Sequence, residues 1–307
     1  MKLFNKPQKV VKIAGIEIGG QVGENPVVMV GSLFYRSHKA CINAKTGEID
    51  KNIAIKDVNI MIEMSQKTGL PIMFDLIGET SEALVNYAQF ISEVAPGIPF
   101  LVDGLSDRAR IPAMREIKNL GLIDYAILNS IDNETTDNNL LEIKDIGVKY
   151  AILLAFEKTS MTPEKKVQFL KGKEGKYKGL LQKAHEAGIK DFLIDTAVLD
   201  IVSIGICAET QQLVKEELGF PVGCAPSNAI FEWERGKELF GKESRIISNA
   251  GICMFLRSYA ADFILFGAAK LAPQIFPAMA LQESLISYYQ QKFNNIKINN
   301  EIRKKIL

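Results

Sequence analysis

The sequence of 307 residues predicts an α/β protein built as a (β/α)8 TIM barrel. Eight short apolar segments recur along the chain, most of them separated by stretches with the apolar spacing of helices. These segments run apolar without alternation, which is typical of parallel strands covered on both faces. An open doubly wound sheet would have the same order of elements, but the count of eight favours the barrel.

The predicted strands are 27–35 (VVMVGSLFY), 71–78 (PIMFDLIG), 99–105 (PFLVDGL), 125–131 (YAILNSI), 150–157 (YAILLAFE), 191–198 (DFLIDTAV), 221–228 (PVGCAPSN) and 262–268 (DFILFGA). Helices are predicted between them, among others over 81–95, 110–121, 178–188 and 208–219. Several of these segments end at or beside a glycine, the usual residue beyond a last helical turn.

The two ends of the chain differ from the repeating pattern. Residues 1–26 contain KVVKIAGIEIGGQ, which predicts a β-hairpin around Gly15 that plugs the bottom of the barrel. The tail from about 290 to 307 is polar and basic, and we expect a terminal helix or a mobile end there. We expect one domain over 1–307, with the hairpin and the tail as extensions of it.

Composition and charge narrow the classes of function. Hydrophobic residues make up 47% and charged residues 24%, as in ordinary globular proteins. The formal net charge of +1 does not favour binding of nucleic acid, and the basic segment 171–179 is interpreted as a solvated loop. There is no signal-peptide pattern and no apolar run of membrane-span length, so we expect a cytoplasmic protein without a membrane span.

Cysteine and histidine usage indicates neither a disulfide framework nor a metal bound by this chain. The four cysteines are scattered without a C-x-x-C pair, and the two histidines, His38 and His185, have no metal-ligand spacing. His185 is interpreted as a surface or hydrogen-bonded helical residue. His38, with Arg36 and Lys39, forms a basic loop that would suit an acidic tail or partner surface, or is simply solvated.

Polar residues follow the predicted strands at the end where barrel enzymes carry their chemistry. They are Asp75, Asp103, Asn129, Ser130, Glu157, Lys158, Asp195, Thr196, Ser227 and Asn228. Each has a structural alternative, since such residues also cap helices and fix turns. Several carboxylates around one barrel mouth repel each other unless a cation or a donor-rich ligand lies between them. A divalent metal and a flat heterocycle with several N–H donors both remain open.

Other chemistries have weaker support in the sequence. Lys158 is the one candidate near a strand end for a Schiff-base lysine. The chain has no G-x-S-x-G elbow, no Walker A loop and no G-x-G-x-x-G after a strand. The segment FGAAK (266–270) could hold a phosphate by its backbone N–H groups, but it is a weak motif.

The strand-end motifs LVDGLS, ILNSID, LIDTAV and GCAPSNAIF, in this order, resemble the pterin-binding barrels of methyltetrahydrofolate to corrinoid methyltransferases. They are closer still to the H subunit of the methanogen tetrahydromethanopterin S-methyltransferase and its bacterial relatives. The segments VVKIAGIEIGGQVGENPVVMVGSLFYRSHK, FDLIGETSEALVNYAQFISEV, ARIPA and FPAMALQESLI share this likeness. The resemblance covers nearly the whole chain.

The resemblance implies roles for the strand-end residues. Asp103, Asn129 and Asp195 would hold the aminopyrimidine ring of a pterin, with Asp75 and Glu79 as neighbours. Asn228 would lie beside N5, the nitrogen that carries the methyl group, so Asn228 and Asp195 are the expected catalytic residues. Ser227 would either support Asn228 or cap the following helix.

The implied function is methyl transfer between a methylated corrinoid protein and N5 of a tetrahydropterin. The chain lacks the D-x-H-x-x-G signature of cobalamin domains, so a separate protein would carry the corrinoid. A homodimer is expected from the family. The methanogen proteins have a glycine-rich stretch where this chain has VLDIVSIGICAETQQ, and SNAIFEWERGK also departs from them. These differences favour tetrahydrofolate over tetrahydromethanopterin.

Two alternatives stay open beside this interpretation. One is a pterin condensation of the dihydropteroate synthase kind, which would require phosphate-binding loops rich in glycine and arginine that are not evident here. The other is a non-catalytic subunit that docks a corrinoid protein within a larger complex.

Overall fold

The computed structural model describes residues 3–158 and 162–307, and its centre is a closed barrel of eight parallel strands. Met1 and Lys2, part of the predicted N-terminal extension, lie outside the described residues. The barrel strands are β3 (Val28–Leu33), β6 (Ile72–Gly78), β7 (Phe100–Gly104), β8 (Ala126–Ile131), β9 (Tyr150–Leu154), β12 (Asp191–Asp195), β13 (Val222–Cys224) and β14 (Phe263–Ala268). All eight fall within the predicted segments, which confirms the (β/α)8 barrel.

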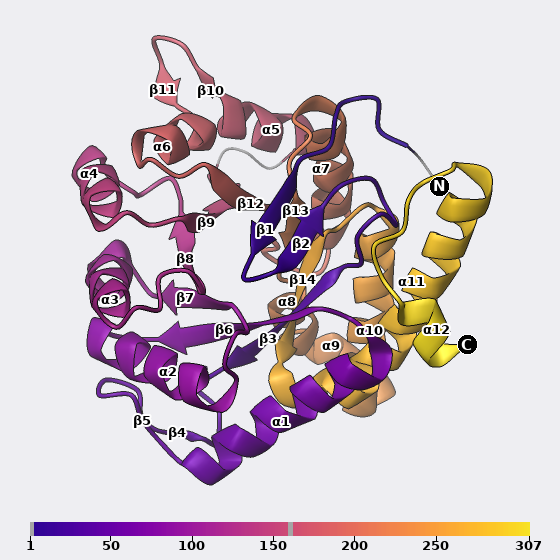
Figure 1. The fold of residues 1–307 in the computed structure, drawn as a ribbon, viewed down its shortest axis with the longest axis horizontal. Coiled ribbons are helices and arrows are strands. Elements are labelled where there is room, and N and C mark those ends of the chain that lie inside the picture. Colours follow the sequence, from indigo (N-terminus) through magenta and orange to yellow (C-terminus); the bar gives the residue numbers. More distant parts are fainter. Residues whose placement is uncertain (1–2, 159–161) are drawn as a thin grey trace.

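Helices form the outer layer around the strands (Figure 1). They are α1 (Lys51–Thr68), α2 (Ser81–Val94), α3 (Asp107–Asn119), α4 (Asp137–Ile146), α5 (Pro163–Lys171), α6 (Leu180–Glu186), α7 (Ser203–Glu217), α8 (Ser227–Phe231), α9 (Glu234–Phe240), α10 (Glu243–Ser258), η1 (Ala269–Leu271), α11 (Ala272–Phe293) and α12 (Ile302–Ile306). Two short antiparallel pairs, β4 (Cys41–Asn43) with β5 (Glu48–Ile49) and β10 (Gly172–Lys173) with β11 (Tyr177–Lys178), lie outside the barrel.

Some predicted helix boundaries were wrong by a few residues. α7 begins at Ser203 rather than at 208, because the carboxylate of Asp200 accepts a hydrogen bond from the Ser203 backbone N–H and so provides the helix start. α3 begins at Asp107 rather than at 110. The segment 171–179 is not a loop throughout. Its two ends pair with each other as a short antiparallel β-ribbon.

The N-terminal hairpin closes the bottom of the barrel, as predicted. β1 (Val10–Ile13) pairs with β2 (Ile16–Gly19), and both turn residues between them have positive φ angles, which suits the right-handed twist of a hairpin. The hairpin side chains Val11, Ile13 and Ile18 are fully buried against residues inside the barrel. Figure 1 shows the hairpin lying across the barrel.

The C-terminal segment is ordered over most of its length. α11 continues to Phe293, past the predicted start of the tail at 290. The backbone N–H of Asn299 donates to the Glu24 carbonyl, and α12 buries Ile302 completely. Lys305 donates to the carbonyl of Gln66 at the end of α1, so the last helix is fixed to the first.

Candidate functional site

The inward-facing residues of the barrel change from apolar to polar at one height. Side chains alternate along a strand, and the apolar interior includes Val30, Met73, Leu101, Ile127 and Leu193. Two residues further along each of these strands the inward position is polar, and these residues are Ser32, Asp75, Asp103, Asn129 and Asp195. The hydrophobic core therefore ends in a ring of oxygen and amide groups at the carboxyl ends of the strands.

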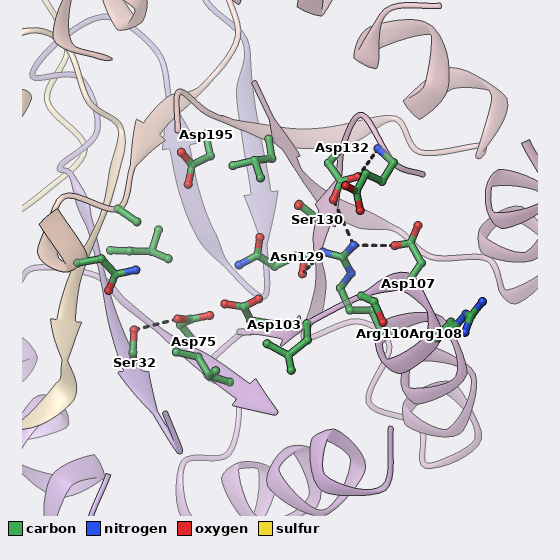
Figure 2. A pocket seen from close by; sticks show the side chains of 18 of the residues that line it. Ser32, Asp75, Asp103, Asp107, Arg108, Arg110, Asn129, Ser130, Asp132 and Asp195 are labelled. Carbon is green, nitrogen blue, oxygen red and sulfur yellow. Dashed lines mark hydrogen bonds and ion pairs between the residues drawn. The ribbon is translucent and has the colours of Figure 1, made fainter. Parts of the chain in front are cut away.

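This polar ring forms the wall of a cavity of about 740 Å³. The cavity brings together seven of the residues named from the sequence: Asp75, Asp103, Asn129, Ser130, Asp195, Ser227 and Asn228. Figure 2 shows Asp75, Asp103, Asn129 and Asp195, from β6, β7, β8 and β12, facing the same space. The pairing register of adjacent strands explains part of this convergence, since Asp103 pairs with Asn129 and Ser32 pairs with Asp75.

Asp75 is the most deeply buried carboxyl of the cavity, with 2% of its surface exposed. The Ser32 hydroxyl donates to its Oδ2 at 2.8 Å, while Oδ1 has no hydrogen-bond partner among the described residues. Burial raises the pKa of Asp75 to about 6, an effect that the Ser32 hydroxyl and the Asn129 amide only partly offset. Burying an oxygen without a hydrogen-bond partner costs free energy, so the Asp75 Oδ1 is available to accept a hydrogen bond from a ligand.

The other two carboxyls of the ring also have raised pKa values. Burial raises the pKa of Asp195 to about 6, although the backbone N–H of Ala197 donates to its Oδ1 at 2.7 Å. Burial and the nearby charge of Asp75 raise the pKa of Asp103 well above its usual value, with Arg110 opposing them. Each raised pKa means that the ring disfavours a further negative charge, so a ligand with several donors is favoured.

Arg110 connects the loops that follow β7 and β8. Its guanidinium donates to Asp107 at 2.8 Å, to Asp132 at 3.2 Å and to the backbone carbonyl of Asn129 at 3.2 Å. Figure 2 shows Arg110 between these two carboxylates at the rim of the cavity. This arrangement fixes the main chain of Asn129 and puts a positive charge where it lowers the pKa of Asp103.

The seventh strand is shorter than predicted. β13 ends at Cys224, whereas the sequence interpretation carried the strand through Asn228. Pro226 has no backbone N–H for a strand ladder and stands directly before α8, so Ser227 and Asn228 form the first turn of that helix. Ser227 is buried, while Asn228 is exposed at the mouth and still lines the cavity.

Several expected neighbours lie elsewhere. Glu79 is exposed and does not line the cavity. The Thr196 hydroxyl is buried and donates to the Gly223 carbonyl. Glu157 and Lys158 border a separate hollow beside the main cavity. Within residues 3–158 and 162–307 no group of histidine, cysteine, aspartate or glutamate side chains is arranged to hold a metal ion.

The basic loop after β3 has a different organisation from the one expected. His38 is buried, its Nδ1 accepts from the Phe34 backbone N–H at 2.9 Å, and its Nε2 lies 2.9 Å from Asp57. His38 is therefore an internal anchor of the loop, and of its three basic residues Arg36 and Lys39 face solvent.

Three residues around the cavity were missed from the sequence. Ser32 stands two positions after Val30 inside a strand, and strict alternation from the apolar core would have placed it in the ring. Arg110 and Lys166 lie on two different helices. The sequence around a long helical side chain does not indicate which groups it contacts. The Lys166 ammonium donates to the carbonyls of Ala155, Thr196 and Ala197, which directly follow β9 and β12.

Comparison with known proteins identifies the family of the chain. Residues 6–298 match the family model described as "Tetrahydromethanopterin S-methyltransferase MtrH subunit". The chain is 34% identical over 288 residues to the H subunit of tetrahydromethanopterin S-methyltransferase from Methanothermobacter thermautotrophicus, covering 92% of this chain and 93% of the relative. It is 32% identical over 295 residues to the protein of the same name from Methanopyrus kandleri, covering 92% and 91%.

Dihydropteroate synthases are among the solved structures that resemble this chain. The enzyme of Yersinia pestis in complex with a sulfonamide drug has a TM-score of 0.62 at 13% identity, covering 91% of this chain and 100% of the other. The enzyme of Xanthomonas albilineans with 4-aminobenzoic acid has a TM-score of 0.60 at 15% identity, covering 91% and 98%. At these identities the likeness supports the barrel fold alone.

No helix in the described part of the chain is both long enough and apolar enough to cross a membrane. By its match over nearly the whole length and by its identity to these relatives, the chain belongs to the MtrH family of tetrahydromethanopterin S-methyltransferase subunits.

Proposed function

We propose that this chain is a methyltransferase that moves a methyl group between a methylated corrinoid carried by a separate protein and N5 of a tetrahydropterin. The observation that carries the proposal is the ring of acceptors formed by Asp75, Asp103, Asn129 and Asp195 at one height of the barrel. The edge of a pterin's aminopyrimidine ring has several N–H donors close together. Such an edge would satisfy the Asp75 oxygen that has no partner among the described residues and the carboxyls whose pKa values are raised.

Asn228 is the residue that we assign to the reacting nitrogen. A tertiary amine is a poor leaving group, so loss of its methyl requires stabilisation at N5 that increases in the transition state. An amide can donate to the N5 lone pair or accept from a protonated N5, and it therefore serves transfer in both directions. Its place at the exposed mouth suits an atom that a second protein must reach.

The corrinoid would supply cobalt as the acceptor or donor of the methyl group, and this chain would supply the orientation of N5. Three apolar side chains support docking of a partner at the rim: Leu105 is 77% exposed, Leu199 43% and Val202 78%. They follow β7 and β12, at the carboxyl ends of the strands. Exposed apolar side chains around a polar opening are typical of protein interfaces.

A homodimer is part of the same proposal. On α11 the side chains of Leu281, Leu285, Tyr288 and Phe293 are exposed by 46%, 60%, 53% and 65%. Their spacing puts most of them on one side of the helix. Sedimentation of the wild type against a Leu285→Glu variant measures the association directly, and a monomeric wild type would contradict this part.

We assign tetrahydrofolate rather than tetrahydromethanopterin as the pterin. The support is in the sequence segments VLDIVSIGICAETQQ and SNAIFEWERGK, where the chain departs from the methanogen proteins. Titration of the protein with each pterin separates the two, and preferential binding of tetrahydromethanopterin would reverse this assignment.

The deciding experiment follows demethylation of a methylated corrinoid protein by its absorption spectrum, with tetrahydrofolate and this protein present. Asn228→Ala should lower turnover by about 10²- to 10³-fold, as for loss of a transition-state hydrogen bond. Its Kd for tetrahydrofolate should change by less than about fivefold. Asn119→Ala, an exposed asparagine at the far end of α3, is the matched control.

Absence of demethylation with both pterins would refute the proposal. Equal turnover of Asn228→Ala and wild type would support a docking subunit without catalysis. Condensation of a pterin with 4-aminobenzoate would support the dihydropteroate synthase alternative.

A further inference from the structure

A second cavity of about 390 Å³ adjoins the main one. Ser32, Ile77, Ser227 and Asn228 line both. The side cavity continues between β3 and the segment after β14, where Tyr35, Phe231, Ala268, Lys270 and Leu271 complete its wall. Its wall thus combines aromatic and aliphatic side chains with the polar groups of three serines and Asn228, and with one ammonium group.

The wall of this side cavity is shaped by a close approach of α8 to β14. Gly267 has a φ of +99°, and a Cβ placed on it would lie 3.0 Å from the Ser227 Cβ. The pairing register between β14 and β3 shifts between Leu265 and Gly267. Only glycine combines this backbone angle with this close contact, so the hollow is a built feature of the strand end.

The opposite wall is held in place by His38. The Tyr35 ring stacks on the His38 imidazole with centroids 5.0 Å apart. His38 is itself fixed by the Phe34 backbone N–H and by Asp57. Tyr35 is therefore positioned before any ligand arrives, which lowers the entropic cost of binding against it.

The open end of the side cavity is cationic. Lys270 is exposed and makes no ion pair with any residue that the structure describes. Arg36, directly after Tyr35, is exposed as well. Cationic side chains beside an aromatic hollow match an arylamine that carries a carboxylate or a phosphate further out.

The covalent structure of a tetrahydropterin connects this hollow to the main cavity. N5 is bonded to C6, and C6 carries the aryl arm. If Asn228 faces N5, the arm begins beside Asn228, which lines both cavities. We infer that the side cavity binds this arm, with the aryl ring against Tyr35 and Phe231 and its acidic end near Lys270. This inference rests on the proposed function.

The test compares two probes that share the ring system. Tetrahydrofolate has the arm, and 6-methyltetrahydropterin has a methyl group in its place; calorimetry gives Kd for both. Lys270→Ala should weaken tetrahydrofolate binding about three- to tenfold, and Tyr35→Ala about tenfold, by loss of a charge contact and of aromatic area. Neither should alter Kd for 6-methyltetrahydropterin by more than about twofold, which also shows that each variant is folded. Lys12→Ala, exposed on the hairpin at the other end of the barrel, is the control.

The outcomes separate the inference from the function. Equal loss for both probes, or no loss for tetrahydrofolate, overturns the arm site and leaves the proposed function standing. Failure of wild type to bind either probe overturns the proposed function itself. Repeating Lys270→Ala with tetrahydromethanopterin, whose arm also ends in acidic groups, shows which of the two arms the site accepts.

Discussion

The ammonium group of Lys166 lies 2.6 Å from the carbonyl oxygen of Thr196 and 3.2 Å from that of Ala197. Ala197 has a φ of +56°, an unfavourable angle for a residue with a Cβ. The same Ala197 donates its N–H to Asp195. Lys166, on α5, therefore holds the turn after β12 that orients the Asp195 carboxyl in the cavity, and it is a positioning residue for Asp195.

Replacing Lys166 with methionine should move the pH dependence of pterin binding. The positive charge of Lys166 lowers the pKa of Asp195, so its loss raises that pKa further. We expect the midpoint of binding to rise by about half to one pH unit. Kd titrations with tetrahydrofolate across pH measure this.

Lys215→Met is the matched control for this change. Lys215 is equally buried, but it bonds Gly20 and Asp262 far from the Asp195 turn. Both variants should melt at lower temperature, since each leaves buried acceptors without a donor. An equal midpoint shift in both variants would show that Lys166 has only a structural role.

In the wild type, affinity for the pterin should fall as pH falls through about 6. Asp75 and Asp195 have pKa values of about 6, and under the proposed function their ionised forms would accept from the pterin ring. Ionised acceptors are present above this pH and are lost below it, so below pH 6 Kd should rise by about tenfold per pH unit for each of the two carboxyls that must be ionised. Calorimetry between pH 5 and 8 is the measurement. A Kd that does not vary over this range would exclude these carboxyls as acceptors.

Asp75→Asn should stabilise the unliganded barrel while weakening pterin binding. A raised pKa means that folding favours protonated Asp75, so the ionised group destabilises the protein above pH 6. A neutral amide removes this cost, and we expect the Tm to rise by about 2 to 5 °C at pH 8. This rise in Tm should disappear near pH 4, where folding no longer has to bury an ionised carboxylate.

Thermal melting of Asp75→Asn at pH 8 and pH 4 checks this prediction. A lower Tm at pH 8 would mean that Ser32 and its neighbours need the carboxylate for stability.

Arg110→Lys should weaken pterin binding although the charge is kept. A single ammonium cannot bridge Asp107, Asp132 and the Asn129 carbonyl as the planar guanidinium does. We expect Kd for tetrahydrofolate to rise about three- to tenfold as the Asn129 segment loosens. The control is Arg115→Lys, a residue on the same helix that makes an exposed ion pair with Asp145. This control should change nothing, and equal effects in both variants would refute the role of Arg110.

The alternation of side chains along strands explains why some residues of the candidate site were predictable from the sequence. The exception is Asn228. Asp75, Asp103, Asn129 and Asp195 each follow a short apolar run, so a strand pattern alone puts them at the mouth. Asn228 was placed in the site for a reason that was partly wrong, since it lies on α8 and not on β13. Pro226 ends the strand there, and the apolar residues before it gave no indication of where the strand stops.

Contacts between distant segments could not be predicted from the sequence. The buried role of His38 depends on Asp57 in α1, and that of Lys166 depends on backbone carbonyls after β9 and β12. A long cationic side chain has the same sequence signature whether its ammonium group is solvated or enclosed. Only the closed barrel brings these partners within reach.

The hairpin closes the lower end of the barrel, opposite the cavity. Val11, Ile13 and Ile18 fill that end, so under the proposed function the pterin and the corrinoid protein would both approach from the carboxyl ends of the strands. The reaction should then be sequential and ordered: the pterin enters first, the larger protein covers it, and a bound corrinoid protein prevents the pterin from leaving.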